Sequence, residues 1–249
     1  MKIGILGTGA IGKTLIQRLS AAGHDVKFAN SRGPETIEAD VLSLGGRPVT
    51  ASEAVRDVDV VILSVPLGRI PGIAPLVADV PPGTLVIDTS NYYPGRDGLI
   101  EAIERGQVES QWVAEHLGRP VAKAWNAISA GSFAATSEPA GSPKRIAIPV
   151  AADSEHDRQV AMGLVEDTGL DAIDAGSLAD SWRQQPGAPC YCTDLTRNEM
   201  PAALATADAA RSPKRREISL AAVMERLAGS GETNPDAEYM VRLSRALFM

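Results

Sequence analysis

The first part of the chain alternates short apolar runs with segments that have helical periodicity. The runs are nearly continuous in Val, Ile and Leu, which is typical of parallel strands buried on both faces of a sheet. Between them, apolar residues recur at helical spacing, so one crossover helix is expected after each strand. The predicted strands are MKIGIL, DVKFAN, VDVVILSVP and GTLVIDTS, and the predicted helices cover residues 10–22, part of 36–44, 70–78 and 99–105.

The alternation continues past Pro120, which predicts further sheet in place of an all-helical second domain. After Gly176 the pattern changes to a loop, QQPGAPCYCT, followed by segments with helical periodicity only. We therefore predict a doubly wound, mostly parallel α/β domain over residues 1–180 and a small helical C-terminal appendage over 181–249. The elements expected in this half are the strands PVAKAWN, RIAIPVAA and LDAIDAG and the helices 155–168, 197–210, 216–228 and 235–248.

Composition narrows the possible partners. The 249 residues carry a net charge of −7, which argues against a nucleic-acid or acidic-membrane surface, because such ligands are bound through many Lys and Arg contacts. No apolar run approaches the roughly 20 residues that cross a bilayer. Met1-Lys2-Ile3 already belongs to a predicted strand, so we expect no signal peptide and a cytoplasmic location. Because the chain is acidic overall, an anionic ligand would have to bind at a local group of basic side chains.

The stretch GTGAIGKTL directly after the first predicted strand satisfies two phosphate-binding patterns. Gly7, Gly9 and Gly12 form the dinucleotide fingerprint G-x-G-x-x-G, whereas Gly7, Gly12, Lys13 and Thr14 form the triphosphate loop G-x-x-x-x-G-K-T. In a triphosphate site Lys13 reaches the phosphates, Thr14 holds magnesium and an acid such as Asp88 orients the metal.

A dinucleotide site makes a second demand, which this chain meets. The end of the second strand must contact the ribose ~20 residues after the glycines, where an acid selects NAD and an arginine accommodates the 2′-phosphate of NADP. That end is Asn30-Ser31-Arg32, with no acid, and Arg32 can pair with a phosphate. We therefore predict a Rossmann-type NADP(H) site. Its predicted cofactor-binding residues are Gly7, Thr8, Gly9, Ala10, Ile11, Gly12, Asn30, Ser31, Arg32, Ser64, Val65, Pro66 and Ile128.

The chain offers few candidates for a general acid or base. His24, His116 and His156 fall at turns or helix ends, where surface or capping roles explain them best. Lys123 is the one basic residue on a strand near the expected pocket. Hydride transfer between two ring cofactors needs close placement of the rings and no strong acid or base, so this scarcity favours an aromatic ring acceptor.

These pieces resemble the NADP oxidoreductases that reduce the 8-hydroxy-5-deazaflavin coenzyme F420, and the NADPH domain of membrane ferric reductases. The resemblance spans roughly residues 1–180 and rests on GTGAIGKTL, ANSRG, VVILSVP, KAWNAISAGSF and DAGSL. It implies that Asn126, Ser129 and Ala130, together with Ile128, form the floor on which nicotinamide meets the acceptor. Asn126 and Ser129 depart from the deazaflavin enzymes, where His and Pro are usual, which leaves deazaflavin and flavin-type acceptors both open.

The leading hypothesis is an NADP(H)-dependent oxidoreductase that exchanges hydride with coenzyme F420 or a flavin, both of them small-molecule acceptors. One alternative is an NADPH-dependent reductase of a small carbonyl or imine, and another is a non-catalytic NADP(H)-sensing protein. The family and the tail suggest a homodimer, although the stripe Tyr239, Met240, Leu243 and Leu247 is typical of ordinary helix packing. RSPKRRE is expected to be a solvated helix start, and Cys190 and Cys192 lack the four ligands of a zinc site, so no metal is predicted.

Overall fold

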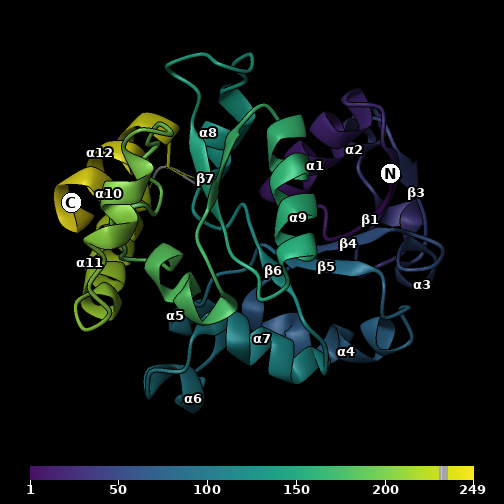
Figure 1. The fold of residues 1–249 in the computed structure, drawn as a ribbon, viewed down its shortest axis with the longest axis horizontal. Coiled ribbons are helices and arrows are strands. Elements are labelled where there is room, and N and C mark those ends of the chain that lie inside the picture. The colour runs from purple at the N-terminus through teal and green to yellow at the C-terminus, as the bar shows by residue number, and fades with distance from the viewer. Residues whose placement is uncertain (230, 232–234) are drawn as a thin grey trace.

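The computed structural model describes residues 1–229, 231 and 235–249, and within them one sheet has six parallel strands. Its order is β3-β2-β1-β4-β5-β6, so the order reverses between β1 and β4 (Figure 1). The predicted doubly wound α/β fold is thereby confirmed. The strands are β1 (Lys2–Leu6), β2 (Asp25–Ala29), β3 (Arg47–Pro48), β4 (Val60–Leu63), β5 (Leu85–Asp88) and β6 (Ala122–Lys123).

Helices cover both faces of this sheet, with α1 and α9 on one side and α4 and α7 on the other (Figure 1). Every residue of β4 and β5 is buried, as their continuous apolar sequences predict. Side chains alternate along a strand, so Ile62 packs with α1 and Val61 packs with α4. The helices of the two layers are α1 (Ala10–Ala21), α8 (Ala130–Ala135), α9 (Glu155–Asp167), α3 (Ala51–Ala54), α4 (Ile70–Ala78) and α7 (Glu109–Leu117).

Short helical turns connect these layers where the sequence predicted longer or no helices. The predicted helix within 36–44 is one turn, and the one over 99–105 spans four residues. The short strand β3 and helix α7 lie where no strand or full helix was predicted. The connecting turns are η1 (Pro34–Thr36), α2 (Ala39–Leu42), η2 (Leu67–Arg69), α5 (Pro94–Asp97), α6 (Glu101–Glu104) and η3 (Leu178–Gln184).

The sheet continues past Pro120 in a different form from the predicted one. Strand β6 is the last of the parallel sheet, whereas β7 (Ala147–Val150) and β8 (Asp171–Asp174) pair in parallel as a separate sheet. An antiparallel bridge joins the two sheets, because the Lys123 amide donates to the Ala151 carbonyl at 2.8 Å and the Ala151 amide donates back at 3.1 Å. The second sheet is therefore a lateral extension that carries the chain toward the C-terminal helices.

The C-terminal extension is helical, with α10 (Met200–Ala205), α11 (Ser212–Leu227) and α12 (Ala237–Phe248). Its helices gather at the end of the molecule farthest from β3 (Figure 1). Phe248 and Leu247 pack onto a third apolar cluster, and the Tyr239 hydroxyl donates to the Ala222 carbonyl at 3.2 Å. The predicted apolar stripe of α12 thus contributes to internal packing.

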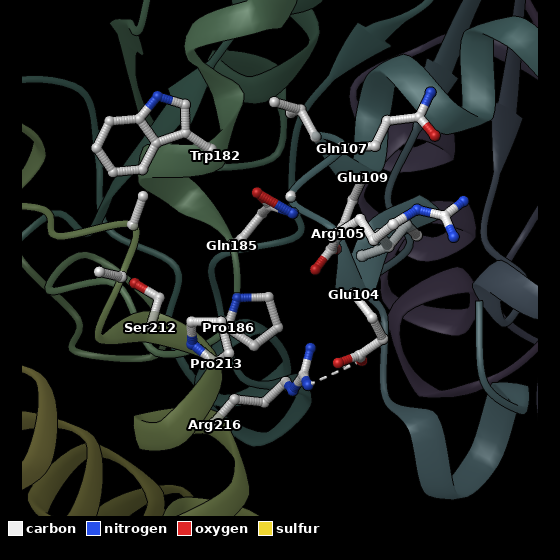
Figure 2. Close-up of a pocket in the computed structure, with 15 residues that line it drawn as sticks. Glu104, Arg105, Gln107, Glu109, Trp182, Gln185, Pro186, Ser212, Pro213 and Arg216 are labelled. Carbon is white, nitrogen blue, oxygen red and sulfur yellow. Dashed lines mark ion pairs between the residues drawn. The ribbon is translucent and has the colours of Figure 1, made fainter. Parts of the chain in front are cut away.

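The basic segment RSPKRRE is not the fully solvated helix start that the sequence suggested. Arg216 is only 6% exposed, and its guanidinium lies 5.1 Å from the Tyr92 ring centroid and 3.5 Å from Glu104 (Figure 2). Lys214, by contrast, is exposed. One arginine of the segment therefore ties α11 to the α/β domain. Among the described residues, every helix is too short or too polar to cross a bilayer.

Candidate functional site

The glycine loop lies where the strand order reverses, which is the usual ligand site of an open α/β sheet. Gly7 follows β1 with φ +111°, a conformation that favours glycine. A Cβ at Gly7 would come within 2.0 Å of the Ser64 carbonyl oxygen, and one at Gly12 would come within 2.1 Å of the Gly7 carbonyl oxygen. Both glycines are therefore required for the first helix to pack against β1 and β4.

Gly9 is different, because among the described residues no atom lies within 4 Å of a Cβ placed there. It is the N-cap of α1, and no described side chain caps that helix. The free amides and the positive dipole end favour an anion at this position. A cavity of about 340 Å³ opens beside them, lined by Thr8, Gly9, Ala10, Lys13, Asn30, Arg32, Thr36, Ile37, Glu38 and Val41.

The loop after β2 presents the side chain of Arg32 to this cavity. The Asn30 carboxamide oxygen accepts the amides of Arg32 and Gly33, each at 2.9 Å, and its nitrogen donates to Thr36. Asn30 therefore shapes the turn that carries Ser31 and Arg32, which are both exposed. The Arg32 guanidinium has no partner among the described residues, so it remains available for an external anion.

The residues of the alternative triphosphate loop are engaged elsewhere. Lys13 Nζ donates to Asp40 at 2.9 Å and to Glu38 at 3.1 Å, and these carboxylates raise the pKa of Lys13. The Thr14 hydroxyl donates to the Ala10 carbonyl within its own helix. Asp88 is fully buried and 2.7 Å from Lys123 Nζ. The arrangement thus favours the dinucleotide interpretation of the loop.

A second, larger cavity of about 650 Å³ adjoins the first helix. Ile128, Ser129 and Ala130, which were predicted as the floor of the acceptor site, line it together with Ile11 from α1. Residues of α11 also line this cavity, and Met240 contributes from α12. The C-terminal extension therefore encloses this cavity. The lining residues are Ile11, Asn91, Tyr93, Gly95, Arg96, Ile128, Ser129, Ala130, Gly131, Tyr191, Cys192, Ser219, Leu220, Val223, Met224, Leu227, Pro235 and Met240.

Asn126 lies beneath this floor and is 2% exposed. Its Nδ2 donates to Asn91 Oδ1 at 3.0 Å and to the Gln184 carbonyl at 2.8 Å, while its Oδ1 accepts from Gln184 Nε2 at 2.8 Å. The Asn91 carboxamide in turn donates to the Asn126 carbonyl at 2.9 Å. Asn126 is thus placed to hold Asn91, which does line the cavity, and not to touch a ligand itself.

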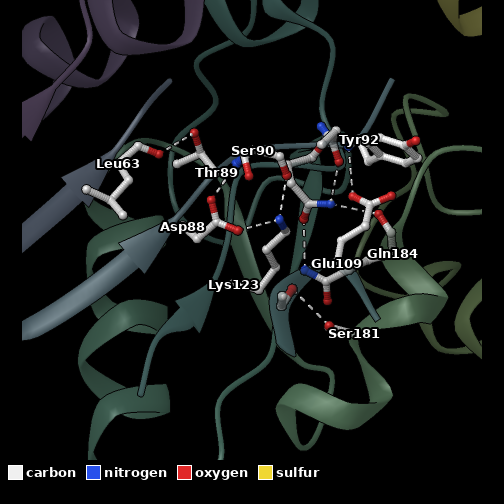
Figure 3. Close-up of polar contacts among 12 residues, drawn as sticks. Leu63, Asp88, Thr89, Ser90, Tyr92, Glu109, Lys123, Ser181 and Gln184 are labelled. Atoms are coloured by element: carbon white, nitrogen blue, oxygen red, sulfur yellow. Dashed lines mark hydrogen bonds and ion pairs between the residues drawn. The ribbon is translucent and has the colours of Figure 1, made fainter. Parts of the chain in front are cut away.

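Below the rim, polar side chains form a buried network at the ends of β5 and β6 (Figure 3). Lys123 Nζ donates to the Asp88 carboxylate and to the Ser90 carbonyl, and Asp88 Oδ1 accepts the Ser90 amide at 2.9 Å. Glu109 accepts the Tyr92 amide at 3.0 Å, and burial raises the pKa of Glu109 to about 7. The network fixes the backbone that leads from β5 to the cavity.

Two tyrosines meet at the cavity, although 98 positions separate them in the chain. The hydroxyls of Tyr93 and Tyr191 lie 2.8 Å apart, and both side chains line the cavity. Nearby, Trp125 and Cys192 adopt φ values of +55° and +54°, which are uncommon for residues other than glycine and are often found at functional sites. Neither tyrosine was predicted from the sequence, because no local pattern links the two segments.

The remaining predicted residues have varied surroundings. Ser64, Val65 and Pro66 follow β4 beside Gly7 but are not among the residues lining either cavity. Two of the histidines have polar partners. His24 Nε2 lies 3.0 Å from Asp167 Oδ2, and His116 Nδ1 lies 2.8 Å from the Trp112 carbonyl oxygen.

The two cysteine thiols are unbridged and buried. Burial raises the pKa of the Cys190 thiol to about 12 and that of the Cys192 thiol still higher, so both stay protonated near neutral pH. Within the described residues, no three His, Cys, Asp or Glu side chains are arranged to hold a metal.

Comparison with known proteins agrees with this geometry. Residues 2–92 match the family described as NADP oxidoreductase, coenzyme F420-dependent. The match includes the glycine loop and the Asn30–Arg32 turn, and it ends before the Asn126–Ala130 segment. Over these residues the match confirms the resemblance to the NADP oxidoreductases that was inferred from the sequence.

Individual relatives cover different shares of the chain. A segment of 56 residues is 54% identical to the Escherichia coli K12 protein YjhV, covering 22% of this chain and 41% of that protein. The chain thus spans about two fifths of the length of that curated relative. A solved structure of a hypothetical protein from Sinorhizobium meliloti aligns with a TM-score of 0.68 and 28% identity over 79% of this chain and 96% of that one.

A second solved structure, from Arthrobacter sp. FB24, is named for a proposed F420-dependent NADP reductase. It aligns with a TM-score of 0.57 and 18% identity, covering 73% of this chain and 87% of that one. At this identity the likeness supports the fold alone.

Proposed function

We propose that the protein transfers hydride between NADPH and a planar ring acceptor of the deazaflavin or flavin type. One observation carries this proposal: Ile11, from the helix of the glycine loop, lines the same cavity as Ile128, Ser129 and Ala130. One end of a dinucleotide bound along that loop would therefore reach the cavity of about 650 Å³, which we call the acceptor chamber. A separate chamber of this kind is what a hydride acceptor requires.

The residues present fit NADP(H). Within the part of the chain that the structure describes, Gly9 leaves open space for the pyrophosphate at a helix N-terminus without a side-chain cap, and the Arg32 guanidinium has no partner and can meet the 2′-phosphate. Asn30 orients the turn on which Arg32 lies. When bound, the cofactor supplies a hydride from its nicotinamide ring.

The chamber suits a flat, largely apolar ring with a polar edge. Leu220, Val223 and Met224 of α11 give this cavity apolar surface, and Tyr93 and Tyr191 add two hydroxyls to its lining. Walls of this kind hold a ring and exclude water while it faces the floor at Ser129–Ala130. Asn126 and the Lys123–Asp88 pair keep that floor and its rim in position.

The test follows loss of NADPH absorbance with oxidised coenzyme F420, and in parallel with riboflavin and a ferric chelate. Ala130→Phe fills the floor and should abolish turnover while NADPH still binds. Ala135→Phe, on the exposed end of the same helix, is the matched control and should behave as the wild type. Tight NADPH binding without turnover of either acceptor would contradict the proposal and favour a sensing protein.

The tyrosine pair favours a second candidate, reduction of a small carbonyl or imine. There the hydride goes to the acceptor carbon, and the Tyr93 or Tyr191 hydroxyl gives its proton to the oxygen or nitrogen. Tyr93→Phe should then lower kcat by about a hundredfold or more with little change in NADPH affinity. With a ring acceptor the same substitution should change KM more than kcat, which separates the two candidates.

A further inference from the structure

A third cavity, of about 420 Å³, lies at the start of α11, whereas the proposed acceptor chamber is lined by residues farther along the same helix. It is bounded by the segment between α6 and α7, by residues 182–186 and by the start of α11 (Figure 2). None of the residues of the glycine loop or of the Asn30–Arg32 turn lines it. Its lining residues are Ile103, Glu104, Arg105, Gly106, Gln107, Val108, Glu109, Trp182, Gln185, Pro186, Ala209, Ala210, Ser212, Pro213 and Arg216.

Arg216 is the unusual group in this cavity. The residue is 6% exposed, and among the described residues its buried Nη2 finds no hydrogen-bond partner. Its nearest carboxylate oxygen, Glu104 Oε1, is 3.5 Å away on a side chain that is 35% exposed. A buried cation normally has hydrogen-bonded anionic partners, so Arg216 is incompletely satisfied by the protein itself.

Other features of the cavity also favour an anion with an organic body. The positive dipole end of the 16-residue helix α11 lies at this cavity, where Ser212 and Pro213 belong to the lining, and Asp208 Oδ1 accepts the amides of Ala210 and Arg211 just before the helix. The Gln185 carboxamide has no partner among the described residues and can both donate and accept. Trp182, Pro186 and Ile103 supply apolar surface. The raised pKa of Glu109 lets its carboxyl act as a donor at or below neutral pH.

We propose that this cavity is a second ligand site, which binds a small organic carboxylate through Arg216. The carboxylate takes the place of the distant Glu104 oxygen, and Glu104 turns toward solvent. Because α11 carries Arg216 at one cavity and Ser219, Leu220 and Val223 at the other, the ligand stabilises the wall of the acceptor chamber. The site is therefore positioned to regulate that chamber.

Benzoate is the probe, and uncharged benzamide is its isosteric control. Calorimetric titration of the full chain should give a benzoate dissociation constant in the millimolar range or below, with benzamide at least about tenfold weaker. Arg216→Gln should weaken benzoate binding by about tenfold or more, whereas Lys214→Gln removes an exposed charge of the same helix turn and should have no effect. Absence of benzoate binding to the wild type overturns the proposal.

Arg216→Gln also removes a contact between α11 and the α/β domain, so a second variant leaves Arg216 intact. Ala210→Trp fills the mouth of the cavity from an exposed position and should abolish benzoate binding without unfolding the protein. Hydrogen exchange on the wild type should slow in residues 209–224 when benzoate is added. Protection confined to residues 30–41 would instead assign benzoate to the Arg32 site and overturn the proposal.

Discussion

Lys123 Nζ lies 2.7 Å from the carboxylate of Asp88, and both side chains are completely buried. The pair joins the last two strands of the parallel sheet, where Lys123 also donates to the Ser90 carbonyl. Lys123 was the basic residue that the sequence placed near the pocket. Its partner makes it a structural cation beneath the rim, which removes it from the candidates for a proton donor.

Removing Lys123 should destabilise the protein strongly. Lys123→Met leaves the Asp88 carboxylate buried without its cation, which typically costs about 3–5 kcal/mol of unfolding free energy. Chemical denaturation of Lys123→Met and of the double variant Lys123→Met/Asp88→Asn measures this cost. The double variant should be the more stable of the two, because it no longer buries an unpaired charge.

An exposed ion pair provides the matched control for that experiment. Arg105 and Glu101 lie 3.0 Å apart with more than 70% of each side chain exposed. Arg105→Met should therefore change stability by no more than about 0.5 kcal/mol. Equal losses in Lys123→Met and Arg105→Met would mean that burial does not govern the energetics of the pair.

The glycines of the loop should separate folding from cofactor binding. Gly12→Ala places a methyl group 2.1 Å from the Gly7 carbonyl oxygen, so thermal unfolding should show a clear loss of stability. Gly9→Ala meets open space in the protein and should fold normally. The same methyl group would occupy the space assigned to the pyrophosphate, so fluorescence titration should give much weaker NADPH binding. Wild-type NADPH affinity in Gly9→Ala would refute the assignment of the loop.

Arg32 should determine the preference between the two nicotinamide cofactors. Loss of a charge-assisted contact to the 2′-phosphate predicts that Arg32→Ala binds NADPH about tenfold or more weakly, with little change for NADH. Titration of both cofactors at two salt concentrations measures this, since the Arg32 contribution should weaken with salt. Arg56→Ala, at another exposed arginine, is the control and should leave both affinities unchanged.

The sequence was most informative where local chemistry determines structure. Continuous apolar runs identified β4 and β5, and helical spacing located α4 at Ile70–Ala78, the range that the structure has. The glycine loop and the Asn30–Arg32 turn could also be predicted, because the dinucleotide fingerprint is defined by residues close together in the sequence. The two-residue strand β3 escaped prediction because its pairing, and not its composition, makes it a strand.

Contacts between segments that lie far apart in the sequence could not be predicted from such local patterns. The Lys123–Asp88 pair depends on β5 and β6 being neighbours, and the Tyr93–Tyr191 pair depends on the loop after η3 lying against the segment after β5. The sequence placed Arg216 in a solvated basic segment, whereas in the structure the packing of α11 buries it. These are features of topology, which periodicity alone does not specify.

Glu109 should make the stability of the protein depend on pH. Burial raises the pKa of its carboxyl from 4.5 to about 7, so between these values the folded state holds a proton that the unfolded state has released. The free energy of unfolding therefore falls as pH rises through this window, by an amount on the order of 3 kcal/mol. Below the window both states are protonated, and above it the full loss persists.

Glu109→Gln isolates this contribution, because its carboxamide is neutral at every pH and its oxygen can still accept the Tyr92 amide. Chemical denaturation at intervals between pH 4.5 and 8 should give a flatter stability profile for the variant than for the wild type. The variant should also be the more stable protein above pH 7, since it no longer buries a carboxylate. Parallel profiles for the two proteins would mean that Glu109 ionises as it does in water, and the buried network would then need another account.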